Sequence, residues 1–280
     1  MKWLLRSGLV LVGLAAVYSM ALAGPMYTSL KLYVGQKNWE RAVKVGPRAI
    51  EEDPEKPDIY NKFGIALAEL DSIQQAGEMF EKGLQLARAQ KDADAEKEVE
   101  SGRDHYYAHY FNQGLASLNG GNDVVDSLGR KADTTSLAVK AALQVAASKF
   151  DKALTSFERA VWLKPDDAKS WSQKGLALTY LHRSGEAMAC FHKALEIDPA
   201  YKNARENLKN SMIEAAEGYK SQGNWPEAAK VFEELFGLGD SASLLDLGDC
   251  YFNEGKATKD SVAKFEKLRK SSGYYGQYAT

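Results

Sequence analysis

Apolar residues recur three or four positions apart along most of the chain after residue 23, which is the spacing of one face of an α-helix. The segment containing Ala153, Phe157 and Ala160 is one example. Only seven prolines occur in 280 residues, and long stretches contain none, which favours helices over a turn-rich β fold. The pattern therefore predicts an all-α protein.

The same helical pattern returns after 34 residues. Shifted forward by that step, the positions Ala153, Phe157, Ala160 and Pro165 fall on Ala187, Phe191, Ala194 and Pro199. Trp171, Gly175 and Leu178 precede the second copy at the spacing of a first helix. Small residues allow two helices to approach closely, aromatic rings fill the space between them, and proline ends the second helix.

This string resembles the tetratricopeptide-repeat (TPR) family, whose units are pairs of antiparallel helices repeating every 34 residues. The resemblance implies a right-handed α-solenoid of about six helix-turn-helix units. The predicted order is units 1 and 2 over 24–90, a charged helical linker over 91–106, unit 3 over 107–167, unit 4 over 168–201, unit 5 over 202–242, a degenerate or capping unit 6 over 241–272, and a tail over 273–280.

The third and sixth units depart from the repeat. Turn-forming residues, beginning with Asn119-Gly120-Gly121-Asn122, predict an inserted loop at about 119–134. An alternative is that 134–167 forms a repeat of its own. In the sixth unit a one-residue insertion brings Phe265 and Leu268 into the register of a second helix.

The first 23 residues have the features of a secretory signal peptide. Lys2 and Arg6 precede an almost wholly apolar run, and Ala21-Leu22-Ala23 offers the small residues of a cleavage site after Ala23. The alternative is an uncleaved membrane anchor. In both cases the rest of the chain is delivered across the membrane, which predicts a periplasmic or secreted protein. If the leader is removed, we expect no stable membrane insertion.

Net charge and cysteine spacing bear on the class of partner and on whether a disulfide can form. A formal charge of −2 is too small to indicate nucleic acid as a partner. Cys190 and Cys250 fall in non-adjacent units, too far apart for a disulfide, and are predicted to be buried free thiols.

No combination of residues indicates catalysis. His105 and His109 lie four positions apart, a spacing that can bind a metal, but no further ligand completes a zinc set. Phosphate-binding loops and nucleophile elbows are absent from the sequence. We therefore predict a non-enzymatic protein with no cofactor and no metal.

The family resemblance also implies a binding surface, because first helices of TPR units line a concave groove. Carried over position by position, the predicted groove residues are Asn61, Ile65, Phe111, Leu115, Leu118, Lys169, Ser172, Leu176, Tyr180, Ile213, Glu217, Lys220, Asp249 and Phe252. The Lys and Asn pattern with which some TPR proteins hold a terminal carboxylate is missing.

The predicted function is a protein-protein interaction scaffold or adaptor that binds a protein or peptide segment in this groove. The alternatives are a small-molecule or peptide-binding periplasmic protein that uses the same groove, and a scaffold that assembles with copies of itself.

Overall fold

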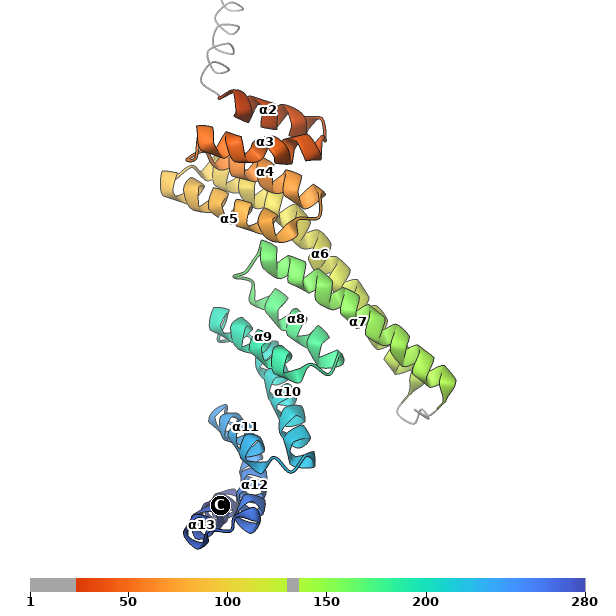
Figure 1. Ribbon diagram of the computed structural model, residues 1–280, viewed down its shortest axis with the longest axis vertical. Coiled ribbons are helices and arrows are strands. Elements are labelled where there is room, and N and C mark those ends of the chain that lie inside the picture. The colour runs from red at the N-terminus through yellow and green to blue at the C-terminus, as the bar shows by residue number, and fades with distance from the viewer. Residues whose placement is uncertain (1–23, 130–135, 280) are drawn as a thin grey trace, which may run out of the picture. The chain divides into compact units, whose positions relative to one another are not determined.

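The computed structural model describes residues 24–129 and 136–279, and over these residues it is helical, without a β-strand. The helices are α2 (Pro25–Gly35), α3 (Trp39–Glu52), α4 (Pro57–Glu69), α5 (Ile73–Gln90), α6 (Ala93–Leu128), α7 (Leu137–Leu163), α8 (Ala168–Tyr180), α9 (Ser184–Ile197), α10 (Lys202–Ser221), α11 (Trp225–Gly237), α12 (Ser243–Ala257) and α13 (Ser261–Tyr278). The all-α prediction is confirmed (Figure 1). The predicted leader, residues 1–23, lies outside the described residues.

The chain forms two compact units, each of which is described by itself. The first contains residues up to 113 together with 158–165, so it includes α2 to α5, the start of α6 and the end of α7. Its consecutive helices pack in pairs, α2 on α3 and α4 on α5. The second contains 114–157 and the residues from 166 onward, in which α8 packs on α9, α10 on α11 and α12 on α13.

Several helix pairs are closed by an aromatic ring that lies against a glycine. Phe191 of α9 is fully buried, and a Cβ added to Gly175 of α8 would lie 2.6 Å from its ring. Phe80 lies in the same way against Gly64, at 3.0 Å. Since a side chain at either glycine would separate the helices, the small residues of the repeat pattern are explained by close packing.

The predicted loop at about 119–134 is wrong over its first ten residues. Helix α6 runs without interruption to Leu128, and α7 begins at Leu137, so residues 119–128 are helical. The rest of the predicted loop lies largely in 130–135, outside the described residues. Gly120 and Gly121, which were expected to form a turn, bring α6 close to α7. Gly121 lies against the ring of Phe150, and Gly120 lies against Lys149.

Helices α6 and α7 thus make a long hairpin in which the second helix is extended at its start (Figure 1). The alternative in which 134–167 is a repeat of its own is excluded, since α7 is one helix without an internal turn.

The predicted linker at 91–106 is also wrong as a separate element. Apart from its first two residues it is the beginning of α6, and it packs against α4 and α5 within the first unit. Val99 is 1% exposed and lies against Gly83 of α5, while Gly102 lies against Asn61 of α4.

The C-terminal residues differ from the prediction in a similar way. Helix α13 continues to Tyr278, so most of the predicted tail is helical. Phe265, expected in the repeat register, is 69% exposed, and Tyr275 lies against Gly248 instead, donating a hydrogen bond of 2.6 Å to Asp249. The larger amphipathic tyrosine can reach this position and keep its hydroxyl hydrogen-bonded.

Both cysteines are free and buried, as predicted.

Candidate functional site

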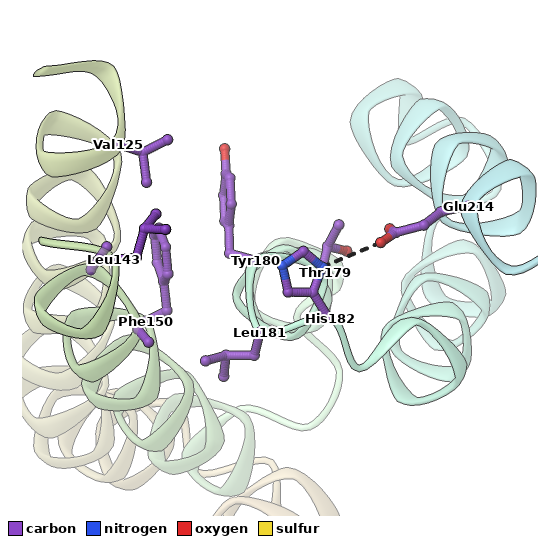
Figure 2. A pocket seen from close by; sticks show the side chains of 10 residues that line it. Val125, Leu143, Phe150, Thr179, Tyr180, Leu181, His182 and Glu214 are labelled. Atoms are coloured by element: carbon purple, nitrogen blue, oxygen red, sulfur yellow. Dashed lines mark hydrogen bonds and ion pairs between the residues drawn. The ribbon is translucent and has the colours of Figure 1, made fainter. Parts of the chain in front are cut away.

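The second unit contains an open, mainly apolar pocket of about 550 Å³. Its wall comes from the far end of the α6–α7 hairpin, and its floor from the end of α8 and the turn that follows (Figure 2). The lining residues are Val125, Leu143, Ala146, Ala147, Phe150, Thr179, Tyr180, Leu181, His182 and Glu214. Pockets that bind ligands or anchor side chains have volumes of this order.

Two stacked rings join the wall to the floor. Phe150 of α7 and Tyr180 of α8 lie nearly parallel, at 9°, with their centroids 4.6 Å apart (Figure 2). Phe150 is buried between α6 and α7, whereas Tyr180 is 38% exposed. The buried ring holds the exposed one in place, so Tyr180 presents an apolar face to the pocket at little entropic cost.

Helix α8 is held on α10 by a short hydrogen-bonded chain. The Thr179 hydroxyl donates to the carbonyl of Gly175 at 3.1 Å and lies 3.2 Å from the hydroxyl of Ser211, which is fully buried. After Tyr180, His182 takes the left-handed backbone conformation (φ 57°) that reverses the chain. These contacts fix the floor of the pocket against its far rim.

One polar pair lies at the far rim. Nδ1 of His182 is 3.4 Å from Oε1 of Glu214 on α10 (Figure 2). The side chains are 86% and 47% exposed, so this contact contributes little to stability. The carboxylate is therefore available at the edge of an apolar pocket.

The structure separates the predicted groove residues by exposure. Four are buried, with at most 5% of the residue exposed: Asn61, Phe111, Leu118 and Ser172. Five are half-buried, namely Ile65, Leu115, Leu176, Lys220 and Asp249, and five are exposed, namely Lys169, Tyr180, Ile213, Glu217 and Phe252. Burial assigns the first four to the core of the repeats, and the binding role of the other ten stays a prediction.

Among the predicted residues of the second unit, Lys220 and Glu217 are brought together. The Lys220 ammonium lies 2.8 Å from Glu217 and 2.8 Å from Asp246 of α12. Burial alone would lower the pKa of Lys220, but the two carboxylates outweigh it and raise the pKa above its ordinary value. Lys220 thus ties α10 to α12, and its charge is already neutralised.

In the first unit, Asn61 and Ile65 line a shallow pocket of about 580 Å³ together with residues of α6. Asn61 is buried, its Nδ2 donates a long hydrogen bond of 3.5 Å to the carbonyl of Glu98, and its Oδ1 has no hydrogen-bond partner within the described part of the chain. That oxygen lies next to Gly102 of α6, where a Cβ would clash with it. The contact locks α4 to α6.

The two histidines weighed as metal ligands lie edge-on to neighbouring tyrosines, His105 to Tyr106 and His109 to Tyr110. Within 24–129 and 136–279, no three His, Cys, Asp or Glu side chains are grouped as a metal site would require. None of the described helices combines the length and the hydropathy that a membrane span requires.

Tyr180 is among the predicted groove residues, but the wall of the pocket is not. Val125 falls within the predicted loop at about 119–134, and Leu143 and Phe150 are not among the predicted groove residues. The spacing of glycines and aromatic residues could have predicted this wall. Gly114 faces Phe157 and Gly121 faces Phe150, so successive contacts are seven residues apart on each of the two antiparallel helices. That step brings a helix back to nearly the same face.

Paired antiparallel helices closed by glycine–aromatic contacts define a helical-repeat protein. Residues 168–201 match a family model described as tetratricopeptide repeat, and residues 213–275 match a second model with the same description. The first match has the boundaries that the 34-residue comparison predicts for unit 4. The chain thus contains tetratricopeptide repeats over these residues, and over its described residues the fold is all-α.

Curated relatives are similar over parts of their length. The peroxisomal targeting signal receptor of Candida albicans is 41% identical over 64 residues, which are 23% of this chain and 11% of the receptor. The mitochondrial import receptor subunit TOM70 of Homo sapiens is 25% identical over 194 residues, 69% of this chain and 30% of that protein. The chain therefore spans between about a tenth and a third of the length of these relatives.

Among solved structures, the nuclear import adaptor Nro1 of S. pombe matches with a TM-score of 0.42 and 13% identity, covering 91% of this chain and 89% of that chain. MamA (residues 41 to the end) from Desulfovibrio magneticus RS-1 matches with a TM-score of 0.27 and 19% identity, covering 78% and 98%. TM-scores this low do not show that this chain and those proteins share the same overall arrangement of helices.

Proposed function

We propose that this protein is a non-catalytic interaction scaffold or adaptor, exported from the cytoplasm, that binds a segment of a partner protein on the surface of its repeats. The observation that carries the proposal is the apolar pocket in which Tyr180 is exposed on a floor fixed by Phe150. Large apolar side chains held open to solvent mark interaction sites.

The pocket has the features of a binding hot spot. Its exposed aromatic residue is rigid, because the stack on Phe150 restricts Tyr180 before any partner arrives. Leu143 and Val125 add exposed apolar surface beside it, 40% and 39% exposed respectively. Preorganised aromatic groups beside aliphatic ones supply much of the affinity of protein interfaces.

The names of the relatives support the same class of function. Two of them are a targeting signal receptor and an import receptor subunit. By analogy we assign to this chain the recognition of a protein segment, and we assign no pathway.

The test is site-specific photocrosslinking in the full chain. A photoreactive residue placed at Tyr180 should capture a defined partner, and one placed at Phe236 of α11, which is 42% exposed but lies outside the pocket, should not. Tyr180→Asp should weaken retention of that partner at least about tenfold, whereas Phe236→Asp should leave it unchanged. Equal capture at both positions, or capture at neither, would count against the proposal.

Export rests on the leader alone. The cationic start, the apolar run and Ala21-Leu22-Ala23 support secretion with cleavage after Ala23. Mass spectrometry of the extracytoplasmic fraction should find a chain that begins at Gly24. Replacing Ala23 with arginine should block that cleavage, because the bulky cation does not fit a small-residue site. A protein that stays in the cytoplasm would remove export from the proposal without affecting the pocket.

A second candidate is a small-molecule binding protein, which the volume of the pocket favours. A ligand that binds only the folded state raises the melting temperature, and Tyr180→Asp should abolish that rise. A metabolite screen with a shift that depends on Tyr180 would support this candidate over a protein partner.

A further inference from the structure

A second hollow lies next to the apolar pocket. It has a volume of about 390 Å³ and is lined by residues of α10 and of the start of α9, mostly polar or small, among them Ser184, Gly218, Tyr219 and Gln222. Glu214 lines both hollows, so a carboxylate stands at the junction of an apolar hollow and a polar one, and we refer to the two hollows together as the groove.

The carboxylate at the junction differs from its acidic neighbours. Glu217, one turn further along α10, is paired with Lys220 at 2.8 Å, and Glu186 of α9 is paired with Arg183 at 2.7 Å. Within the described residues, Glu214 has no lysine or arginine partner, only the exposed His182 at 3.4 Å. Glu214 is thus a negative charge that the fold leaves without a permanent cation.

We propose that the groove binds a protein segment in which a large apolar side chain stands next to a lysine or arginine. The apolar side chain enters the pocket beside Tyr180 and Phe150, and the basic group pairs with Glu214. This inference rests on the proposed binding function and names the chemistry of the partner.

Charge and surroundings favour a basic residue over a neutral or acidic one. A charge-assisted hydrogen bond to a carboxylate is about twice as strong as a neutral one. The Glu214 side chain is 47% exposed, so we expect the gain from pairing to be that of a partly exposed ion pair. An acidic residue at the same place would be repelled by Glu214.

The test uses three capped decapeptides of one sequence, with a Leu-Phe core followed by lysine, glutamine or glutamate. They are titrated into the full chain, and the methyl NMR signals of Val125 and Leu143 report occupancy of the pocket. We expect the lysine peptide to bind roughly two- to fivefold more tightly than the glutamine peptide and the glutamate peptide to bind most weakly, as for a partly exposed ion pair.

Reversing the charge on the protein gives the decisive comparison. In Glu214→Lys the order of the peptides should invert, and in Glu214→Gln the three should bind equally. Glu206→Lys, an exposed change on the same helix, should keep the original order. Far-UV circular dichroism of each variant checks that the fold is retained.

The outcomes separate the two claims. If all three peptides bind equally to the unaltered chain and Tyr180→Asp abolishes binding, the pocket binds segments but the role of Glu214 is wrong. If no peptide shifts the methyl signals of the pocket, this segment chemistry is wrong, and the crosslinking experiment at Tyr180 decides on the proposed function independently.

Discussion

The two adjacent glycines of α6 give the sharpest test of the hairpin that forms the pocket wall. Gly121→Ala adds a methyl group that would lie 2.7 Å from Cδ1 of Phe150, with Cε1 closer still. Phe150 is buried between α6 and α7 and stacked on Tyr180, so its ring has little room to move. Gly120→Ala places its methyl group 2.9 Å from Nζ of Lys149, the mobile end of a flexible side chain.

The two substitutions share one effect and differ in the other. Each replaces glycine by alanine in a helix, which stabilises by about 1 kcal/mol. Overpacking at Gly121 costs about 1–3 kcal/mol, whereas Lys149 can turn aside from the new methyl at Gly120. We therefore expect Gly120→Ala to stabilise by up to about 1 kcal/mol and Gly121→Ala to be about 1–3 kcal/mol less stable than Gly120→Ala.

The assay is urea unfolding followed by circular dichroism, with amide hydrogen exchange in the hairpin as a local readout. The local measurement is needed because repeat proteins can unfold unit by unit. Adding Phe150→Leu should remove most of the penalty at Gly121, with a coupling of about 1 kcal/mol in the double-mutant cycle. If both glycine variants change stability equally, Gly121 does not pack on Phe150 and the hairpin geometry is refuted.

Three further predictions concern other contacts. Arg159→Ala should lower the stability of the first unit by about 1 kcal/mol in chemical unfolding, because Arg159 pairs with Asp71 at 2.7 Å and lies over the ring of Tyr110. Lys37→Gly should raise the melting temperature, since Lys37 has φ 55° and glycine removes about 1 kcal/mol of left-handed strain; an unchanged or lower value would contradict this. Burial raises the pKa of the Cys250 thiol to about 11, so alkylation should be at least about 100-fold slower at pH 8 than in urea and should accelerate as pH rises and thiolate forms.

The repeat units were predictable because they depend on local spacing. In unit 4, Gly175 and Phe191 are 16 residues apart, as are Gly64 and Phe80 of unit 2, and both pairs are in contact. A short turn fixes that separation, so the same pattern implies the same contact wherever it occurs. The α7 positions Ala153 and Phe157 are fully buried for the same reason.

The binding surface was less predictable because exposure depends on what packs next. Asn61 occupies a groove position in the repeat pattern, yet the start of α6 covers it through Gly102. Tyr180 occupies the corresponding kind of position on α8 and stays 38% exposed, although the ring of Phe150 stacks on it. The groove positions were carried over from repeats of ordinary length. They cannot take account of the contacts that the long helices α6 and α7 add.

The hairpin shows why a glycine is ambiguous when it is read alone. Without a Cβ, glycine serves a turn and a close helix approach equally well, so Asn119-Gly120-Gly121-Asn122 is consistent with both. The partner residues resolve the ambiguity. From Gly114 to Gly121 the first helix advances seven residues, and from Phe157 to Phe150 the second retreats seven, and both pairs are in contact. One heptad further back, the Lys164 ammonium lies 4.5 Å from the centroid of the Tyr107 ring in the same register. A turn at Gly120 would leave Phe150 without its small partner, so the register of the antiparallel helices requires α6 to continue and, with it, the wall of the pocket.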